Sequence, residues 1–462
     1  MRYATVVALL RGSGAALLVL SISVLGAPSA LADQPPSGDA LQGAYPYDSF
    51  ERPQACATCH VDIARQHEQA MMSQAFTHAW DEIEYFELAV PHAAKEPKVA
   101  GVKAGCNGCH APFAFMAGEI PPQRPSAGTR ANEAVSCDLC HTMVGFEGDT
   151  PYNFNFILDP GRTKRGPRPG LESPHHATVD SAFHKTAELC GTCHNEKSPY
   201  GIWVKSTYLE WKDGPHGKAG IVCQDCHMPP AAGRSARMGS ELPDVRQHLF
   251  HGAHDPGKLA GVIEVRIHPD LREVEPGDKV KLTATVVNAK AGHKVPSGSV
   301  EDRMLWLHVE AQGPDGKVYA LPVDPKGFEG EEYTIASDSA MAYQDIGDIQ
   351  GVEGFPGLAR DGDAPAGDRI FRLPYFDPDG RMTIAQWHTA SLGTDYRLAP
   401  LEAKNETYTW TVPDLPAGPV TVTATIWYSR LVPSVGRYMH VPEEEWRPVR
   451  INSHQTTLTV LP

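Results

Sequence analysis

Cys56-Ala-Thr-Cys59-His60 is the first of five pentapeptides in which two cysteines are separated by two residues and a histidine follows directly. The other four are Cys106-Asn-Gly-Cys109-His110, Cys137-Asp-Leu-Cys140-His141, Cys190-Gly-Thr-Cys193-His194 and Cys223-Gln-Asp-Cys226-His227. Together they use all 10 cysteines of the chain. The C-x-x-C-H pattern is typical of c-type haem attachment, in which both thiols bind the porphyrin and the imidazole binds the iron. The sequence therefore predicts five covalently bound haem c groups, with these ligands to iron: His60, His110, His141, His194 and His227.

Two other roles for the cysteines fit the pattern less well. Disulfides would suit an exported chain, but they do not require regular spacing or an adjacent histidine. Zinc ribbons use C-x-x-C pairs, yet zinc chemistry does not call for a histidine after all five. Because five haem groups would crowd the segment from Cys56 to His227, we expect a loop-rich, mainly helical domain with the haems as its core. Helices are predicted over 61–80 and 181–190, and a loop over 151–174.

The chain changes character after His254, where cysteines no longer occur. Turn signals such as Gly313-Pro-Asp-Gly316 separate runs rich in β-branched residues. These runs cover residues 262–267, 279–287, 304–311, 317–321, 407–412, 420–428 and 456–460. Short, partly alternating strands of this kind predict an all-β, Ig-like sandwich. The segment from about 324 to 403 is long for a loop, so we expect it to be an insertion that packs on the haem domain.

The first 32 residues have the features of a signal peptide. Arg2 and Arg11 precede or flank a short apolar run over 15–26, and Ala30-Leu31-Ala32 fits a cleavage site. The apolar run is shorter than the roughly 20 residues that span a bilayer. We expect cleavage near Ala32 and export to the periplasm or beyond the cell, with no membrane span in the mature chain. The predicted domains are therefore a signal peptide at 1–32, a pentahaem domain at 33–257 and a β-sandwich at 258–462.

Composition excludes two classes of protein. Of the 462 residues, 41% are hydrophobic, which is enough to rule out a disordered chain. The formal net charge is −15, whereas nucleic-acid binding depends on basic side chains that neutralise phosphates. We therefore expect no nucleic-acid partner.

Residues 56–254 resemble the multihaem cytochromes c related to hydroxylamine oxidoreductase, pentahaem nitrite reductase and the tetrahaem cytochrome of nitrifying bacteria. The resemblance rests on the haem motifs and on the phrases Val135-Ser-Cys-Asp-Leu-Cys-His141, Leu189-Cys-Gly-Thr-Cys-His194, Tyr208-Leu-Glu-Trp211 and Cys223-Gln-Asp-Cys-His-Met-Pro229. Gly292-His-Lys-Val-Pro-Ser-Gly298 and the run Arg303 to His308 resemble the sandwich that follows many such cytochromes. One departure is that the nitrite reductases have lysine in place of one motif histidine, whereas all five motifs here end in histidine.

The resemblance also implies candidates for the second iron ligands. In this family a distal histidine often ends a Trp-x-x-Ser-x-His phrase, which points to His216 after Trp211 and, by position, to Met72 after the first motif. Met72 is alternatively a packed helix residue. Two groups of histidines supply further candidate ligands: His176 and His184 beside His175, and His248 and His254 beside His251. The alternative for each group is a solvent-exposed face without a role in iron binding. His293 is either a loop residue or a ligand that joins the sandwich to the haem domain.

Two functions remain open at this point. If every iron has two axial ligands, the protein transfers electrons between periplasmic or membrane redox partners whose identity the sequence does not give. If one iron keeps an open position, the protein is an oxidoreductase that acts on a small nitrogen or sulfur compound. Spare histidines and the absence of a lysine-ligated haem favour electron transfer, while enzymatic activity and oligomeric state stay open.

Overall fold

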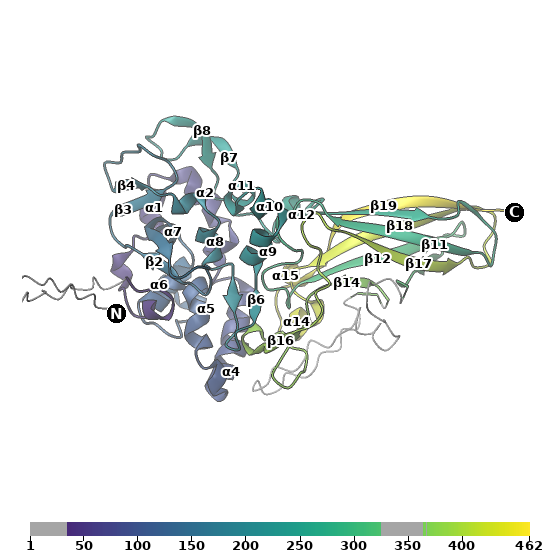
Figure 1. The fold of residues 1–462 in the computed structure, drawn as a ribbon, viewed down its shortest axis with the longest axis horizontal. Coiled ribbons are helices and arrows are strands. Elements are labelled where there is room, and N and C mark those ends of the chain that lie inside the picture. The colour runs from purple at the N-terminus through teal and green to yellow at the C-terminus, as the bar shows by residue number, and fades with distance from the viewer. Residues whose placement is uncertain (1–34, 325–363, 366) are drawn as a thin grey trace, which may run out of the picture. The chain divides into compact units, whose positions relative to one another are not determined.

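The computed structural model describes residues 35–324, 364–365 and 367–462. The predicted signal peptide and much of the predicted insertion thus lie outside the described residues. The described residues from Pro36 to Pro462 belong to one compact unit. Its first part is helical and its second part is rich in strands, as Figure 1 shows and as the sequence predicted.

The first part consists of short helices joined by loops. Its α-helices are α1 (Pro53–Ala57), α2 (Val61–Glu68), α3 (Ala79–Ile83), α4 (Val90–Lys95), α5 (Val102–His110), α6 (Pro112–Met116), α7 (Cys137–Thr142), α8 (Glu188–Gly191), α9 (Thr207–Asp213), α10 (Pro215–Lys218), α11 (Cys223–His227) and α12 (Pro256–Leu259). The 3₁₀-helices are η1 (Gly38–Leu41), η2 (Tyr47–Ser49), η3 (Met71–Gln74), η5 (Pro97–Val99), η6 (Pro125–Ala127), η7 (Arg130–Glu133) and η8 (Phe183–Lys185), and η4 (Glu84–Ala89) is a π-helix. Even α5 has only nine residues. An isolated helix needs about 12 to be stable in water, so these helices depend on packing.

Four two-stranded sheets complete this part. They pair β1 (Met143–Phe146) with β2 (Phe156–Leu158), β3 (Thr163–Gly166) with β4 (Ala177–Asp180), β5 (Glu196–Lys197) with β6 (Trp203–Lys205), and β7 (Pro230–Arg234) with β8 (Glu241–Arg246). The β3–β4 pair is parallel and the others are antiparallel. The expectation of a loop over 151–174 was therefore wrong at β2 and β3, because their pairing partners lie outside that segment.

The single helix expected over 61–80 is interrupted. The backbone at Ala70 is extended, and so is the backbone at His78 before α3. The Ser73 hydroxyl donates to the carbonyls of Glu68 and Ala70 at 2.9 and 2.8 Å, which competes with the backbone pattern of a continuous helix. Likewise, residues 181–190 form η8 and the start of α8, and His248 and His251 lie outside any helix.

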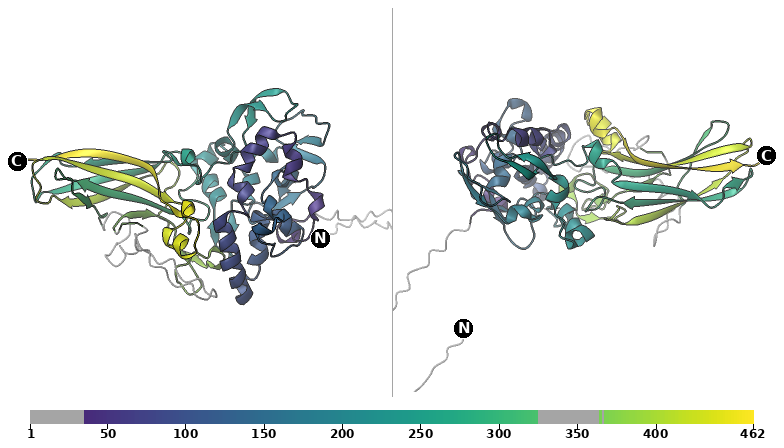
Figure 2. Two further views of the ribbon diagram at one scale, coloured as in Figure 1. Left: turned by 180° about the vertical axis from the view of Figure 1, so that it is seen from behind. Right: turned by 90° about the horizontal axis from the view of Figure 1, so that it is seen from above.

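The strand-rich part contains two larger sheets (Figures 1 and 2). One has the order β10 (Glu273–Val274), β19 (Val449–Val460), β18 (Gly418–Ser429), β12 (Met304–Gln312), β13 (Val318–Ala320), with β14 (Arg369–Phe371) also paired to β12. The other has the order β17 (Ala403–Thr411), β11 (Lys279–Asn288), β9 (Ile263–Pro269). The β10–β19 pair is parallel, while the other pairs are antiparallel. Each of the seven predicted strand runs overlaps one of these strands.

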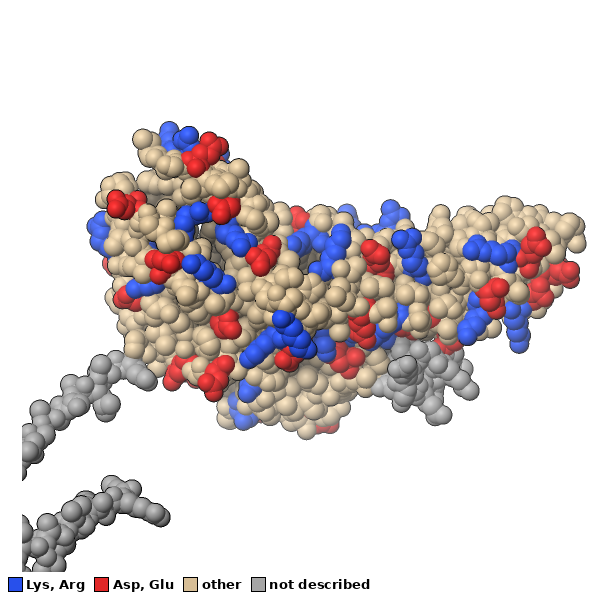
Figure 3. All heavy atoms as spheres, turned by 45° about the horizontal axis from the view of Figure 1, so that its top comes forward, with Lys and Arg blue, Asp and Glu red and all other residues tan. Residues whose placement is uncertain are grey.

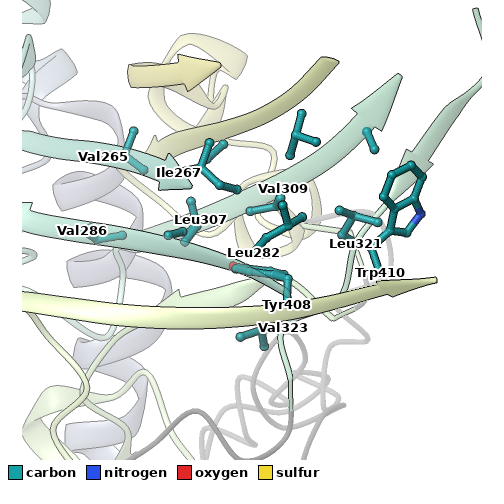
Figure 4. Packing of buried hydrophobic residues seen from close by; sticks show 14 of the residues in the cluster. Val265, Ile267, Leu282, Val286, Leu307, Val309, Leu321, Val323, Tyr408 and Trp410 are labelled. Carbon is teal, nitrogen blue, oxygen red and sulfur yellow. The ribbon is translucent and has the colours of Figure 1, made fainter. Parts of the chain in front are cut away.

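The two sheets enclose a common hydrophobic core. Alternate residues of β9 and β11 are buried, as a strand with one face on the core requires. Figure 4 shows Val265 and Leu282 from one sheet close to Leu307 and Val309 from the other. The alternation fails over residues 304–307 of β12, where all four are buried. The outer side of β12 is covered as well, because Trp306 packs in a second cluster that contains Ile370.

The described end of the predicted insertion holds β14, β15 (Tyr375–Phe376), η9 (Gln386–His388) and β16 (Ser391–Leu392). It contacts the helical part directly. The Trp387 indole N–H donates to His92 Nδ1 at 3.1 Å, and the Ser198 hydroxyl donates to the Thr389 carbonyl at 2.7 Å. Two more short helices, α14 (Pro433–Tyr438) and α15 (Glu443–Trp446), follow β18.

Candidate functional site

All five C-x-x-C-H motifs include a helical turn. The second, third and fifth motifs lie within α5, α7 and α11, while the first and fourth overlap α1 and α8. A helical turn brings residues i, i+3 and i+4 to one face, so both thiols and the imidazole of a motif point the same way. This is the local arrangement that attachment to one porphyrin requires. None of the ten cysteines, all of which lie in the described part of the chain, forms a disulfide.

The second and fourth motifs have glycine between their cysteines, and in both the glycine permits a close approach. A Cβ at Gly108 would lie 2.4 Å from the ring of Phe154. A Cβ at Gly191 would lie 2.7 Å from atoms of Pro151 and Tyr208. Neighbouring chain therefore packs directly on the backbone of these motifs.

The motifs are also close to one another. The thiol of Cys137 interacts with that of Cys56 and raises its pKa, which places the first motif near the third. Analogous contacts join Cys109 to Cys193, between the second and fourth motifs, and Cys190 to Cys223, between the fourth and fifth. The third motif adjoins the fourth through electrostatic interaction of Cys140 with Cys193. The five motifs thus form one continuous cluster.

Four of the five motif imidazoles contact a backbone carbonyl oxygen through Nδ1, which leaves Nε2 for a haem iron. The Nδ1 atoms of His60 and His141 lie 2.5 Å from the carbonyl oxygens of Ser235 and Arg165. The remaining two contacts join His110 to Ala75 at 2.8 Å and His227 to His251 at 2.7 Å. An Nδ1–H donated to a carbonyl fixes the tautomer and leaves the Nε2 lone pair for a metal.

Three motif imidazoles face a second imidazole. His60 lies 6.3 Å from His176 between ring centroids, with an interplanar angle of 29°, and His227 lies 6.5 Å from His293 at 13°. Two imidazoles on opposite sides of one metal ion have centroids about 6 Å apart, given a metal–nitrogen distance of about 2.0 Å and a ring radius of about 1.1 Å. The observed separations therefore fit a pair of axial ligands.

His141 has two histidines at this range. Its centroid is 5.9 Å from that of His184 and 6.3 Å from that of His248, with interplanar angles of 20° and 24°. His184 Nε2 lies 2.8 Å from the Cys140 carbonyl oxygen, whereas the contact of His248 with the Arg246 carbonyl oxygen uses Nδ1. His248 therefore keeps its Nε2 available, as the motif histidines do.

Burial favours the neutral form of several imidazoles at the motifs. Desolvation, followed by the nearby His293, lowers the pKa of His227 to about 4, and desolvation followed by His141 lowers the pKa of His248 to about 3. Desolvation also lowers the pKa of His194. A neutral imidazole offers the lone pair that iron needs, so the residues present fit covalently bound haem c.

The other predicted distal ligands lie elsewhere. Met72 is in η3, where its carbonyl accepts a hydrogen bond from the Val135 N–H at 3.2 Å. His216 is in α10 with a buried, unpartnered Nδ1, and its ring closely approaches Gly292, next to His293. His254 lies beside Glu445 rather than beside a motif histidine, with its Nε2 at 3.4 Å from the carboxylate. His175 contributes a carbonyl oxygen to Arg162.

A group of buried charges near the second motif was not predicted from the sequence. Glu84 and Glu301 both have a pKa well above the usual range, because of burial and then the nearby Asp302. Both carboxylate oxygens of Glu301 are buried without a hydrogen-bond partner. Lys205 stays charged because Glu196, Glu301 and Glu84 together outweigh the cost of its burial, which keeps its pKa high. These residues come from segments far apart in the chain, so no local motif could have revealed them.

Elsewhere, opposite charges lie side by side. Figure 3 shows Lys and Arg interspersed with Asp and Glu over the face that it presents. Among the residues that the structure describes, no helix is both long and apolar enough to cross a membrane.

Comparisons with known proteins agree with the site. Residues 55–142 match the family "Cytochrome c554 and c-prime". The chain is 24% identical over 187 residues to cytochrome c-552 of Haemophilus influenzae (strain Rd), and 23% identical over 192 residues to the same protein of strain 86-028NP. Each alignment covers 40% of this chain and 29% of the relative.

A crystal structure with a similar fold is that of a penta-heme cytochrome c552 from Thermochromatium tepidum. It has a TM-score of 0.60 at 19% identity, and the alignment covers 90% of this chain and all of the other. The similarity therefore extends over the helical part and the strand-rich part. Taken with the motif geometry, these comparisons support a multihaem cytochrome c with covalently bound haem c.

Proposed function

We propose that this chain is an exported pentahaem c-type cytochrome that transfers electrons between periplasmic or membrane redox partners. The observation that carries the proposal is the facing of motif imidazoles by second imidazoles at His60, His141 and His227. An iron with two protein ligands has no position left for a substrate. A haem c gains and loses one electron at its iron, and the continuous cluster of motifs keeps all five attachment points close together.

The same geometry supports a proposal for the haem ligands. We propose attachment through all ten cysteines and proximal ligation by the five motif histidines. His176 is the proposed partner of His60, His293 the partner of His227, and His248 the partner of His141, with His184 as the alternative there. Met72, His216 and His254 stay predictions for the remaining positions. The two-domain division near residue 257, the Ig-like character of the sandwich and cleavage near Ala32 are also part of the proposal.

The order of contacts suggests a route through the protein. The first motif contacts the third, the third adjoins the fourth, and the fourth contacts both the second and the fifth. The fourth motif is therefore the branch point of the cluster. We propose that electrons entering at the first motif reach the fourth through the third, and leave near the second or the fifth.

A second candidate function is supported by one observation. In the described part of the chain, neither His110 nor His194 has a second imidazole in ring contact. The buried carboxyl group of Glu84 lies near Cys106 of the second motif, and Glu84 and Glu301 both have a raised pKa that favours the protonated form. An open iron at His110 would suit the reduction or oxidation of a small nitrogen or sulfur compound.

Two measurements on the purified holoprotein test the proposal. Mass spectrometry of the denatured chain gives the number of attached haems; five are expected, and fewer than four would contradict the count. Electron paramagnetic resonance (EPR) then separates the functions. Only low-spin iron is expected for an electron carrier, whereas a high-spin component that responds to nitrite or CO would favour the enzyme. Loss of low-spin signal in His248→Ala but not in His184→Ala would settle the ligand opposite His141.

A further inference from the structure

A cluster of metal-binding side chains lies outside the haem motifs. It consists of His78 before α3, His254 before α12 and Glu445 in α15, which we call the triad. One ligand atom from each residue lies within 4.8 Å of the others. We propose that the triad binds a divalent transition-metal ion of the zinc class.

The geometry of the triad points to a shared ligand. Glu445 Oε2 lies 2.9 Å from His78 Nε2 and 3.4 Å from His254 Nε2, so both imidazoles present the same nitrogen to one oxygen. Their ring centroids are 5.2 Å apart and the rings are nearly perpendicular, at 86°. Both Nε2 atoms are buried, and neither has a partner in hydrogen-bond geometry. The Glu445 carboxylate is thus the nearest charged group to both nitrogens, and a cation bound by all three atoms would give each buried nitrogen a partner of good geometry.

A second carboxylate, that of Asp81, contacts the other ring nitrogen of His78. His78 Nδ1 lies 2.9 Å from Asp81 Oδ2, the contact by which metal-binding histidines are commonly oriented. With Nδ1 directed at Asp81, Nε2 is the nitrogen of His78 that faces the triad. Asp81 is therefore a positioning residue for the site.

The donor set selects the class of metal. Two imidazole nitrogens and one carboxylate oxygen, with a fourth position for water, are typical of catalytic zinc sites. Calcium and magnesium prefer oxygen ligands only. The side chains of the triad are 10, 21 and 16% exposed, so the site is sheltered but reachable from solvent.

The triad is distinct from the axial positions of the second haem. Asp81 Oδ1 lies 3.4 Å from Nδ1 of His110, on the edge of that ring opposite the iron-binding Nε2. Asp81 thus stands between His110 and His78. The triad lies behind the proximal ligand, and a metal there would not compete for that iron.

Zinc binding by the full-length holoprotein tests the proposal. The protein is treated with a chelator, dialysed and titrated with ZnCl₂ by isothermal calorimetry, with zinc also counted by mass spectrometry. We expect one zinc per chain, with affinity at least tenfold weaker in Glu445→Gln and His254→Ala. Asp81→Asn should keep the stoichiometry and weaken binding about tenfold, as loss of a supporting carboxylate does elsewhere. Glu444→Gln, an exposed neighbour in the same helix, should bind zinc as the parent does.

Two results would overturn the proposal. One is that the parent protein binds no more zinc than Glu445→Gln does. The other is that His254→Ala converts one haem from low to high spin in the EPR spectrum while zinc affinity is unchanged, which would make His254 an axial ligand. The Soret spectrum and circular dichroism identify a variant that has lost its fold. In that case His78→Gln, which keeps a polar side chain of similar size, is measured in its place.

Discussion

Replacement of His176 by alanine distinguishes the two ligands that have been considered for the first haem. The sequence resemblance points to Met72, whereas the structure places His176 opposite His60 with ring centroids 6.3 Å apart. That separation matches the value of about 6 Å for two imidazoles on one metal ion. We therefore expect His176→Ala to remove the sixth ligand of this haem, and Met72→Ala to leave it in place.

The expected magnitude follows from the number of motifs. One of five haems changes its ligand set, so about one fifth of the low-spin iron should become high-spin. Low-temperature EPR measures this fraction, with the total iron determined on the same sample. His175→Ala is a matched control, because the neighbouring residue is exposed and its hydrogen bonds in the described structure involve only its backbone. A redox titration should show one changed potential in His176→Ala and none in the control.

The opposite pattern would refute the structural reasoning. If His176→Ala keeps all its low-spin signal while Met72→Ala loses a fifth of it, the thioether is the ligand. In that event the first haem should also have the highest potential of the five, because methionine ligation favours ferrous iron relative to two histidines.

Three further predictions concern stability. Burial, followed by the charge of His388, lowers the pKa of His92 to about 4, and Trp387 donates to its Nδ1, so the neutral form is favoured by folding. The folded pKa lies below the unfolded value of about 6.5. The contribution of His92 to the free energy of unfolding is therefore fully present above pH 6.5, and it is lost as the pH falls from there through 4. It amounts to about 3 kcal/mol, measured as the difference in pH dependence of the unfolding free energy between the parent and His92→Gln; equal slopes would contradict it. Gly108→Ala should cost about 1–3 kcal/mol because a Cβ would meet Phe154 at 2.4 Å, and an unchanged melting temperature would show that the ring moves aside. Leu282→Ala, at a site with 0% exposure between the two sheets, should cost about 2–5 kcal/mol in denaturant unfolding; a cost below 1 kcal/mol would mean that the core closes around the missing atoms.

The strand-rich part could be predicted well because its signal is local. In β11, one face of the strand is buried, and Val280, Leu282, Ala284 and Val286 recur at every second position. Such a pattern depends only on neighbours in the chain. The outer cover of β12 was missed, since it comes from Ile370, a residue that no local pattern connects with Trp306.

The helical part could be predicted only at its motifs. The spacing of Cys56, Cys59 and His60 is set by the chemistry of haem attachment, so it can be recognised in the sequence without knowledge of the fold. The second ligands have no such spacing, because any histidine that the chain carries to the right place will serve. The sequence could name His176 and His293 as candidate ligands, but only the structure pairs each with a particular motif histidine. His78 and Glu445 come together only through the packing of α15.

The strand-rich part and the helical part are also stabilised in different ways. The strand-rich part buries one continuous core between its two larger sheets, and this hydrophobic burial stabilises it directly. The helical part consists of helices shorter than an isolated helix needs, and it holds ten cysteines, nine of them partly buried and Cys226 exposed. Burial lowers the pKa of His248 to about 3, so its imidazole is neutral in the folded chain at neutral pH. A neutral imidazole offers its lone pair to a metal, so haem binding would add a favourable interaction at the proposed ligands in the part of the chain that has the smaller hydrophobic core.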